Sequence, residues 1–408
     1  MDEQKLVPKL RFPGFTDPWE QRKLGEMGST YSGMSGKTKE DFGHGEAVYI
    51  PYLNIFQNTL SNLSMTDKVE IDDTQNKVEY GDILFTTSSE TPEEVGLSSV
   101  WLGNQENLYL NSFCFGYRLK EIIDLYFLGY ALRSPYMRNQ MKILAQGISR
   151  YNISKNKVMD LQINIPCIKE QKYIGEIFLR IDSLITLHQR KLEHLKLKKK
   201  SLLQKLFPRE GELYPELRFP GFTDPWEQRK LGEIYKRVNE RNDGTLGRDK
   251  WISVAKMYFQ DPEKVQSNNL DTRTYVMKKG DIAFEGHPNN EFKFGRFVLN
   301  DIGTGIISEL FPIYRPIVKY DLEFWKYAIQ LERIMAPIFS KSITSSGNSS
   351  NKLDQNHFLN QMISIPTIDE QKKIGLILKT ITNLITLHQR KLEHLQLLKK
   401  ALLQQLFV

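Results

Sequence analysis

The chain has 408 residues, too many for one ordinary hydrophobic core, so we expect two or three domains. Its 40% hydrophobic and 26% charged residues exclude a disordered or collagen-like chain. The two cysteines, Cys114 and Cys167, lie far apart, which excludes a disulfide framework and is typical of a reducing compartment. There is no signal-peptide pattern and no apolar run of membrane-spanning length, so the sequence predicts a soluble cytoplasmic protein with no membrane partner.

The net charge of +7 is unevenly distributed along the chain. Residues 166–207 hold ten basic and four acidic side chains, and residues 228–365 and 366–408 are also net positive. A basic surface permits a polyanionic partner but does not by itself establish one.

An internal repeat determines the predicted architecture. Leu10–Glu26 (LRFPGFTDPWEQRKLGE) recurs without a difference as Leu217–Glu233, and Leu184–Leu195 (LITLHQRKLEHL) recurs as Leu384–Leu395. The roughly 130 residues between these blocks barely align in the two halves. Each half therefore has a shared frame and an individual middle.

The middles have the pattern of a mixed α/β (α+β) fold. The helices that we expect carry apolar residues at steps of three and four after an Asp N-cap, and they cover Asp124–Leu132 and Asp321–Leu331. Polar loops are expected at Gly147–Lys155 and Ser345–Asn351. The expected strands, in chain order, are Ala47–Leu53, Gly81–Phe85, Phe113–Leu119, Gln162–Ile165, Trp251–Val254, Gly280–Phe284, Ile306–Tyr314 and Gln361–Ile365.

Two long amphipathic helices are predicted, over Glu170–Phe207 and Glu370–Val408, because apolar residues recur there at helical spacing. Each apolar stripe needs a partner, and the twin helix in an antiparallel pair is the obvious one. The stripes differ mainly at Lys198, where the second copy has Leu398. We predict the pair interface to consist of Ile181, Leu184, His188, Leu192, Leu195, Leu202, Ile381, Leu384, His388, Leu392, Leu395 and Leu402.

These elements predict a pseudo-two-fold repeat of two globular domains separated by the helix pair. The predicted boundaries are 1–166 for the first domain with its N-terminal segment and 167–214 for the first long helix with the hinge. The second domain covers 215–366 and the second long helix 367–408.

Motifs for catalysis or metal binding are weak. Gly33–Thr38 resembles a phosphate loop, but Tyr31 stands where the Walker pattern requires Gly, and the continuation is too polar and glycine-rich for a helix. The histidines of the long helices are six residues apart, which does not place two metal ligands on one face. Asp82 and Asp281 follow a turn glycine and are read as turn formers. We therefore predict no catalytic residue, no metal site and no cofactor in this chain.

Polar and basic loops are the positive evidence for function, because they hold groups that contact phosphates and base edges. Arg150–Lys155 combines a guanidinium, an aromatic ring and an amide, and Thr86–Ser89 is a run of donors after a strand. The candidate DNA-binding residues are Lys37, Thr87, Ser88, Arg150, Tyr151, Asn152, Lys155, Asn290, Lys293, Arg296, Asn351 and Lys352.

The duplicated blocks resemble the specificity subunit of type I restriction-modification systems. The resemblance covers essentially the whole chain and includes Ile165–Gly175 (IPCIKEQKYIG) and Ile365–Gly375 (IPTIDEQKKIG). It implies that each middle is a target recognition domain reading half of a bipartite, asymmetric site in double-stranded DNA. It also implies that the paired helices set the gap between the half-sites and hold two methyltransferase subunits, which restriction and translocase subunits join. S-adenosylmethionine, ATP and Mg would then be bound by those partners, and this chain would not be an enzyme.

Two other classes of protein stay open at this point. One is a duplicated adaptor without catalytic activity that binds protein or RNA. The other is a cryptic nuclease with an unrecognised site in a middle domain.

Overall fold

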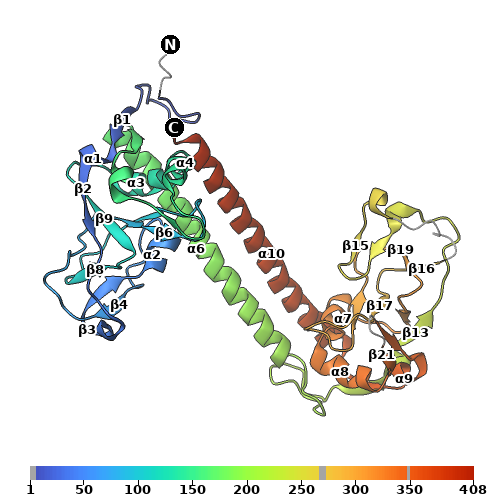
Figure 1. Ribbon diagram of the computed structural model, residues 1–408. Coiled ribbons are helices and arrows are strands. Elements are labelled where there is room, and N and C mark those ends of the chain that lie inside the picture. Colours follow the sequence, from blue (N-terminus) through green and yellow to red (C-terminus); the bar gives the residue numbers. More distant parts are fainter. Residues whose placement is uncertain (1–5, 266–272, 347–349) are drawn as a thin grey trace. The chain divides into compact units, whose positions relative to one another are not determined.

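The computed structural model describes residues 6–265, 273–346 and 350–408. The chain forms two compact units (Figure 1). Unit 1 contains Met1–Gln189 together with Arg390–Val408, and unit 2 contains Arg190–Gln389. The two long helices, α6 (Ile168–Lys205) and α10 (Ile368–Gln405), therefore each contribute one end to either unit.

Unit 1 is built around the four-stranded sheet β2-β9-β5-β7. A three-stranded sheet, β4-β3-β8, contacts it through β8 and β9. Two short pairs, β1 with β11 and β6 with β10, complete its strands. The bounds are β1 Glu20–Lys23, β2 Gly28–Ser32, β3 Phe42–Ile50, β4 Asp67–Val69, β5 Ile83–Thr86, β6 Ser88–Ser89, β7 Ser98–Val100, β8 Leu108–Leu110, β9 Cys114–Leu119, β10 Tyr151–Asn152 and β11 Gln162–Ile165. The short helices are α1 Leu24–Met27, η1 Lys39–Asp41, α2 Tyr52–Gln57, α3 Leu125–Leu132, α4 Pro135–Leu144 and α5 Lys155–Met159.

Unit 2 repeats the central sheet in the order β13-β20-β17-β18. Its other strands pair two by two, β12 with β23, β14 with β15, β16 with β19 and β21 with β22. The strand bounds are β12 Glu227–Lys230, β13 Tyr235–Val238, β14 Ile252–Ser253, β15 Tyr258–Phe259, β16 Thr274–Met277, β17 Ile282–Glu285, β18 Arg296–Leu299, β19 Gly305–Ser308, β20 Ile313–Pro316, β21 Ile343–Ser346, β22 Asn351–Leu353 and β23 Met362–Ile365. The helices are η2 Leu231–Glu233, η3 Arg248–Lys250, η4 Pro262–Lys264, α7 Leu322–Ala328, α8 Glu332–Ser340 and α9 Gln355–Leu359.

The two sheets correspond residue by residue. Ile83 of β5 pairs with Tyr117 of β9, and Ile282 of β17 pairs with Tyr314 of β20. The helix after the sheet starts in both units at an Asp N-cap, because Asp124 accepts from the Phe127 backbone N–H and Asp321 from that of Phe324. This confirms the helices predicted at these two aspartates.

The core of each unit is closed by the end of a long helix. In unit 1, Leu402, Leu406 and Phe407 of the α10 segment pack in the same cluster as Phe178 and Ile181 of α6. The ring centres of Phe178 and Phe407 lie 5.8 Å apart, and the Lys399 ammonium donates to the Asp182 carboxylate. Because the contact partner moves back along the chain as the first helix advances, the two helix segments run antiparallel within unit 1. In unit 2, the cluster contains Leu202, Leu206 and Phe207 of the α6 segment together with the α10 residues Ile374, Leu378 and Ile381.

The repeated blocks have a structural explanation in an ion pair that occurs once per unit. Arg11 donates from Nε and Nη2 to both carboxylate oxygens of Glu170, at 2.8 Å each. Arg218 binds Glu370 in the same bidentate way at 2.8 and 2.9 Å. The glutamates are buried, so the first block and the EQ pair at the start of each long helix must be retained together.

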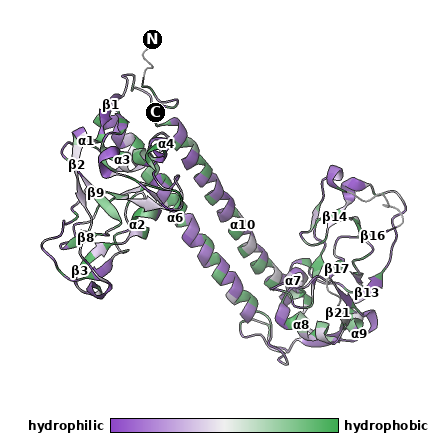
Figure 2. Cartoon of the chain, viewed as in Figure 1, coloured by the Kyte–Doolittle hydropathy of each residue, from purple (hydrophilic) through white to green (hydrophobic). Residues whose placement is uncertain are grey.

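The long helices confirm the predicted amphipathic pattern, which is visible as alternating hydrophilic and hydrophobic residues along each one (Figure 2). Ile181, Ile381, Leu192, Leu392, Leu202 and Leu402 are buried, whereas Leu195, Leu395, His188 and His388 are half-buried. Leu184 and Leu384 are exposed, so their part in the pair interface stays a prediction. Leu184 lines a hollow together with His394 and Leu395 of α10. At 3.6 residues per turn, Ile185 follows Ile181 on the same face and position 184 falls on its flank. Lys198 and Leu398 are likewise exposed.

Several strand predictions were wrong in extent. The strand expected over Ala47–Leu53 ends at Ile50, because Pro51 interrupts it and α2 begins at Tyr52. The single strand expected over Ile306–Tyr314 is two strands, β19 and β20, separated by a turn. The loop expected over Ser345–Asn351 is the hairpin β21–β22, of which residues 347–349 lie outside the described part, and the loop over Gly147–Lys155 contains β10.

Candidate nucleic-acid interface

The sequence candidates of unit 1 gather at one end of its four-stranded sheet. β5 ends and β9 begins there, since Thr86 pairs with Cys114 and Thr87 donates its backbone N–H to the Phe113 carbonyl. β10 is tied to the same end because the Ile153 N–H bonds the Thr87 carbonyl. We call this group the first edge cluster, and it consists of Thr87, Ser88, Phe113, Arg150, Tyr151, Asn152 and Lys155.

Arg150 is the exposed cation of the first edge cluster. Its guanidinium donates from Nη2 to the Ser88 hydroxyl at 3.1 Å and lies 5.6 Å from the centre of the Phe113 ring. Ser88 itself is buried, so it orients Arg150 and has no open surface for a ligand. Lys155 reaches the Ser32 hydroxyl at 3.0 Å, at the end of β2. Asn152 is exposed and Tyr151 half-buried.

Two half-buried arginines, Arg133 and Arg138, bind backbone carbonyls of the segments next to this end of the sheet. Arg138 donates to the carbonyls of Glu93, Val95 and Gly96 in the loop between β6 and β7. Arg133 donates to the Ser98 carbonyl and to three carbonyls at the end of α2. Burial lowers the pKa of each arginine to about 10, so both remain charged at neutral pH.

The corresponding end of the unit 2 sheet brings together a different set. Arg296 donates to Glu285 and to the Ala255 carbonyl, and its guanidinium lies 5.2 Å from the Phe292 ring centre. The Asn351 N–H bonds the Gly286 carbonyl. We call this group the second edge cluster, and it consists of Glu285, Gly286, Asn290, Lys293, Arg296, Leu310, Asn351 and Lys352.

The sequence candidates in this second edge cluster differ in accessibility. Asn290, Lys293 and Lys352 are exposed, whereas Asn351 is buried. Arg296 is half-buried and occupied by its ion pair with Glu285, so its guanidinium stabilises the start of β18. Asn290 and Lys293 therefore lie on an open loop, between β17 and β18.

Lys37 is the candidate that does not join an edge cluster. Its ammonium forms an ion pair with Asp72 at 2.8 Å, which holds the Gly33–Thr38 loop, and this pairing lowers the pKa of Asp72. Only the three-residue helix η1 follows the loop. The loop therefore lacks the helix N-terminus that a phosphate site requires.

Sequence reasoning missed one charged arrangement that occurs in both units. Asp82 accepts from Nε and Nη2 of Arg118 and from the Tyr31 hydroxyl, at 2.7–2.8 Å. Asp281 accepts from Arg315 at 2.9 Å twice. Each Asp also accepts the backbone N–H three residues before it, which confirms the turn reading. The buried carboxylates are committed to these partners, so neither is free to hold a nuclease metal.

We expect Asp82→Asn to lower the free energy of unfolding by about 2–3 kcal/mol, because it leaves Arg118 without its buried counter-charge. The value stays at the low end of the range for buried pairs because Arg118 is partly exposed. Urea unfolding measures the change. Asp73→Asn, which removes an exposed ion pair with Lys77, is the matched control and should change stability by less than about 0.5 kcal/mol. Equal effects of the two variants would contradict the role of Asp82.

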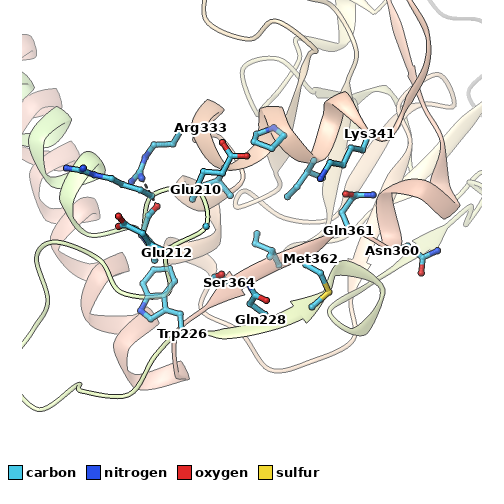
Figure 3. Close-up of a pocket in the computed structure, with 17 residues that line it drawn as sticks. Glu210, Glu212, Trp226, Gln228, Arg333, Lys341, Asn360, Gln361, Met362 and Ser364 are labelled. Atoms are coloured by element: carbon cyan, nitrogen blue, oxygen red, sulfur yellow. Dashed lines mark hydrogen bonds between the residues drawn. The ribbon is translucent and has the colours of Figure 1, made fainter.

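One hollow of about 300 Å³ lies within unit 2 (Figure 3). It is bounded by hinge residues 208–212, the β12–β23 pair and helix α8. Glu210 and Glu212 come from the hinge, and Gln228 and Ser364 from the β12–β23 pair. Arg333 beside them is occupied, since it donates to the carbonyls of Leu203, Gln204, Phe207 and Pro208 at the end of α6. Acidic and basic side chains both line the hollow, Glu210 and Glu212 with Arg209, Arg333 and Lys341, so it is not a surface of one charge.

Within the described residues, no group of three or more His, Cys, Asp and Glu side chains is placed to hold a metal ion. No helix in the same part of the chain has an apolar stretch that could cross a bilayer.

Comparisons with known proteins find similar chains of one kind. A family model described as "Type I restriction modification DNA specificity domain" matches residues 16–197. Two relatives from Methanocaldococcus jannaschii, the putative type I restriction enzyme MjaX specificity subunit and the MjaVIII specificity subunit, are 24% and 23% identical. Each match covers 98% of this chain, with 95% and 93% of the relative. The crystal structure of a type I restriction-modification S subunit from M. genitalium matches with a TM-score of 0.58 at 16% identity, covering 98% of this chain and 99% of that one.

Proposed function

Because the chain belongs to the type I restriction-modification DNA specificity family and is its DNA-recognition component, we propose that each unit reads one half of a bipartite, asymmetric site. The observation that carries this proposal is the pair of edge clusters. They occupy the same end of corresponding sheets but hold different side chains. Residues 1–166 and 215–366 act as the two recognition domains, and the helical segments 167–214 and 367–408 set the gap between the half-sites.

The partners of this chain include two methyltransferase subunits, one for each copy of the repeated block. Thr16, Asp17 and Pro18 are exposed, as are their counterparts in Leu217–Glu233. Exposed residues have no packing reason to stay identical while the neighbouring middles diverge. Two copies of one partner, bound at both blocks, supply such a reason. Restriction and translocase subunits complete the assembly.

The chemistry is divided among these subunits. This chain supplies sequence recognition and is not an enzyme. S-adenosylmethionine is bound by the methyltransferase subunits, and ATP and Mg by the restriction subunits. Because its partner is chromosomal or incoming DNA, the complex acts in the cytoplasm.

The test is to express the chain with its own modification subunits in cells and to sequence the methylated genome. We expect one motif with two unlike half-sites separated by unread base pairs, and the purified complex should protect the same duplex in footprinting. Methylation without a bipartite motif, or protection of RNA but not duplex DNA, would overturn the proposal. Cleavage of DNA by the chain alone would favour the nuclease reading.

A further inference from the structure

An exposed apolar side chain stands at the same position of both sheets. In unit 1, the pairing of β5 with β9 continues to Phe113, which faces Thr87 just before β9 begins. In unit 2, Phe284 donates to the Pro312 carbonyl, and continuing the same antiparallel register brings Leu310 opposite Gly286. Phe113 is 55% and Leu310 83% exposed.

The correspondence is independent of sequence similarity. Asn111–Phe113 and Ser308–Leu310 share no residue at matching positions, yet each segment ends with a large apolar side chain at this position. Single exposed apolar residues are common on proteins. Here one recurs at the same register position in two middles that otherwise barely align, and both times it is within an edge cluster.

The surroundings of these two side chains are polar. The Phe113 carbonyl accepts from the backbone N–H and the hydroxyl of Thr87, and Arg150 covers part of its ring. The Leu310 N–H bonds the Ser308 hydroxyl, which fixes the turn so that the side chain points outward. Each apolar group is thus held by its backbone while its side chain has open surface.

We propose that Phe113 and Leu310 make the apolar contact to bases in the first and second half-site, respectively. Duplex DNA offers two apolar features at such a position, the 5-methyl group of thymine and the face of a base at an opened step. Both present the same chemistry to a phenyl or isobutyl group. This inference rests on the proposed function, since it assigns a contact within the DNA site that the two units read.

The test uses the complex of the full chain with its modification subunits and duplexes that carry its methylated motif. Phe113→Ala should weaken binding about tenfold, or about 1.4 kcal/mol, and should lose discrimination only in the first half-site. Leu310→Ala should do the same in the second. Tyr80→Ala (58% exposed) and Ile317→Ala (49% exposed) are matched controls, because each side chain lies at the opposite end of its sheet. Both should bind within about twofold of the unchanged complex.

Two arms separate the apolar features. Uracil in place of thymine weakens binding by the unchanged complex but not by Phe113→Ala if the methyl group is the contact. A 2-aminopurine probe at steps away from the methylated adenines brightens with the unchanged complex, and not with Phe113→Ala, if a step is opened. Phe113→Leu keeps an apolar group without the ring that Arg150 covers, so it should retain most of the affinity.

The proposal is overturned if both alanine variants bind like their controls, or if Phe113→Leu is as weak as Phe113→Ala. If the unchanged complex fails to distinguish its bipartite motif from a scrambled duplex, the proposed function fails and this inference with it. If the complex reads its motif normally but neither the uracil substitution nor the 2-aminopurine probe gives the expected effect, only the apolar contact is refuted.

Discussion

Replacing residues 234–364 with the matching segment of another specificity subunit is expected to change one half of the methylated motif and leave the other half unaltered. The exchange keeps the Leu217–Glu233 block and α10, so the Arg218–Glu370 ion pair is retained. The residue that replaces Asp321 must still cap helix α7. Its backbone N–H must also reach the amide oxygen of Gln371, which accepts the Asp321 N–H at 3.1 Å. Methylome sequencing gives the motif directly.

The reciprocal exchange of residues 27–164 provides the control for this experiment. It lies between the corresponding boundaries of unit 1 and should change the other half-site. If either exchange altered both halves of the motif while the complex stayed active, recognition would not be modular.

A fragment of residues 1–213 is expected to form a dimer. In this fragment the unit 1 core loses Leu402, Leu406 and Phe407, which pack on Phe178 and Ile181 in the whole chain. Leu202, Leu206 and Phe207 lie 200 positions earlier, and they are the same residue types at the same spacing. A second copy can therefore donate its own helix end to the open core, and the first copy does the same in return.

Charged groups at this junction favour the same pairing. Lys399 bonds Asp182 at 2.6 Å and lies 5.3 Å from the Tyr130 ring centre, all within unit 1. The fragment has Lys199 at the equivalent position, so it can make this contact. Lys198, where the two apolar stripes differ, is exposed and should not weaken the dimer.

Sedimentation of the fragment measures its association. Leu202→Arg should leave it monomeric, because burying an unpaired guanidinium costs several kcal/mol. Leu197→Arg is the matched control, since Leu197 is exposed, and it should leave the dimer intact. A fragment that stays monomeric at high micromolar concentration would contradict the exchange of helix ends.

The elements that the sequence predicted well are those with a strong local signal. Both long helices start and end within about three residues of the expected bounds, because their apolar period is unbroken. The Gly-Asp turns located β5 and β17, and an Asp cap located α3 and α7. Helix α8 was missed because Pro337 lies inside it, which a sequence pattern reads as a break.

The candidate site was predicted only in part, because its contacts join distant segments. Polarity alone could not tell that Ser88 is buried under Arg150, or that Arg296 is occupied by Glu285. Phe113 and Leu310 have apolar side chains, so a pattern of phosphate- and base-contacting polar groups does not include them. Tyr117-Arg118 and Tyr314-Arg315 are 197 residues apart, as are Phe113 and Leu310. Aligning the two Tyr-Arg pairs would therefore have given Phe113 and Leu310 the same aligned position.

The way each core is closed has a consequence for synthesis on the ribosome. Unit 2 is assembled from one uninterrupted stretch, Arg190–Gln389, so every part of its core exists once that stretch has been translated. Unit 1 begins first but needs Leu402, Leu406 and Phe407, which are among the last residues to be made. During translation the first unit therefore waits with an uncovered apolar surface until after the second can fold. A nascent chain halted near residue 400 would expose that surface to chaperones or to another nascent chain of the same kind.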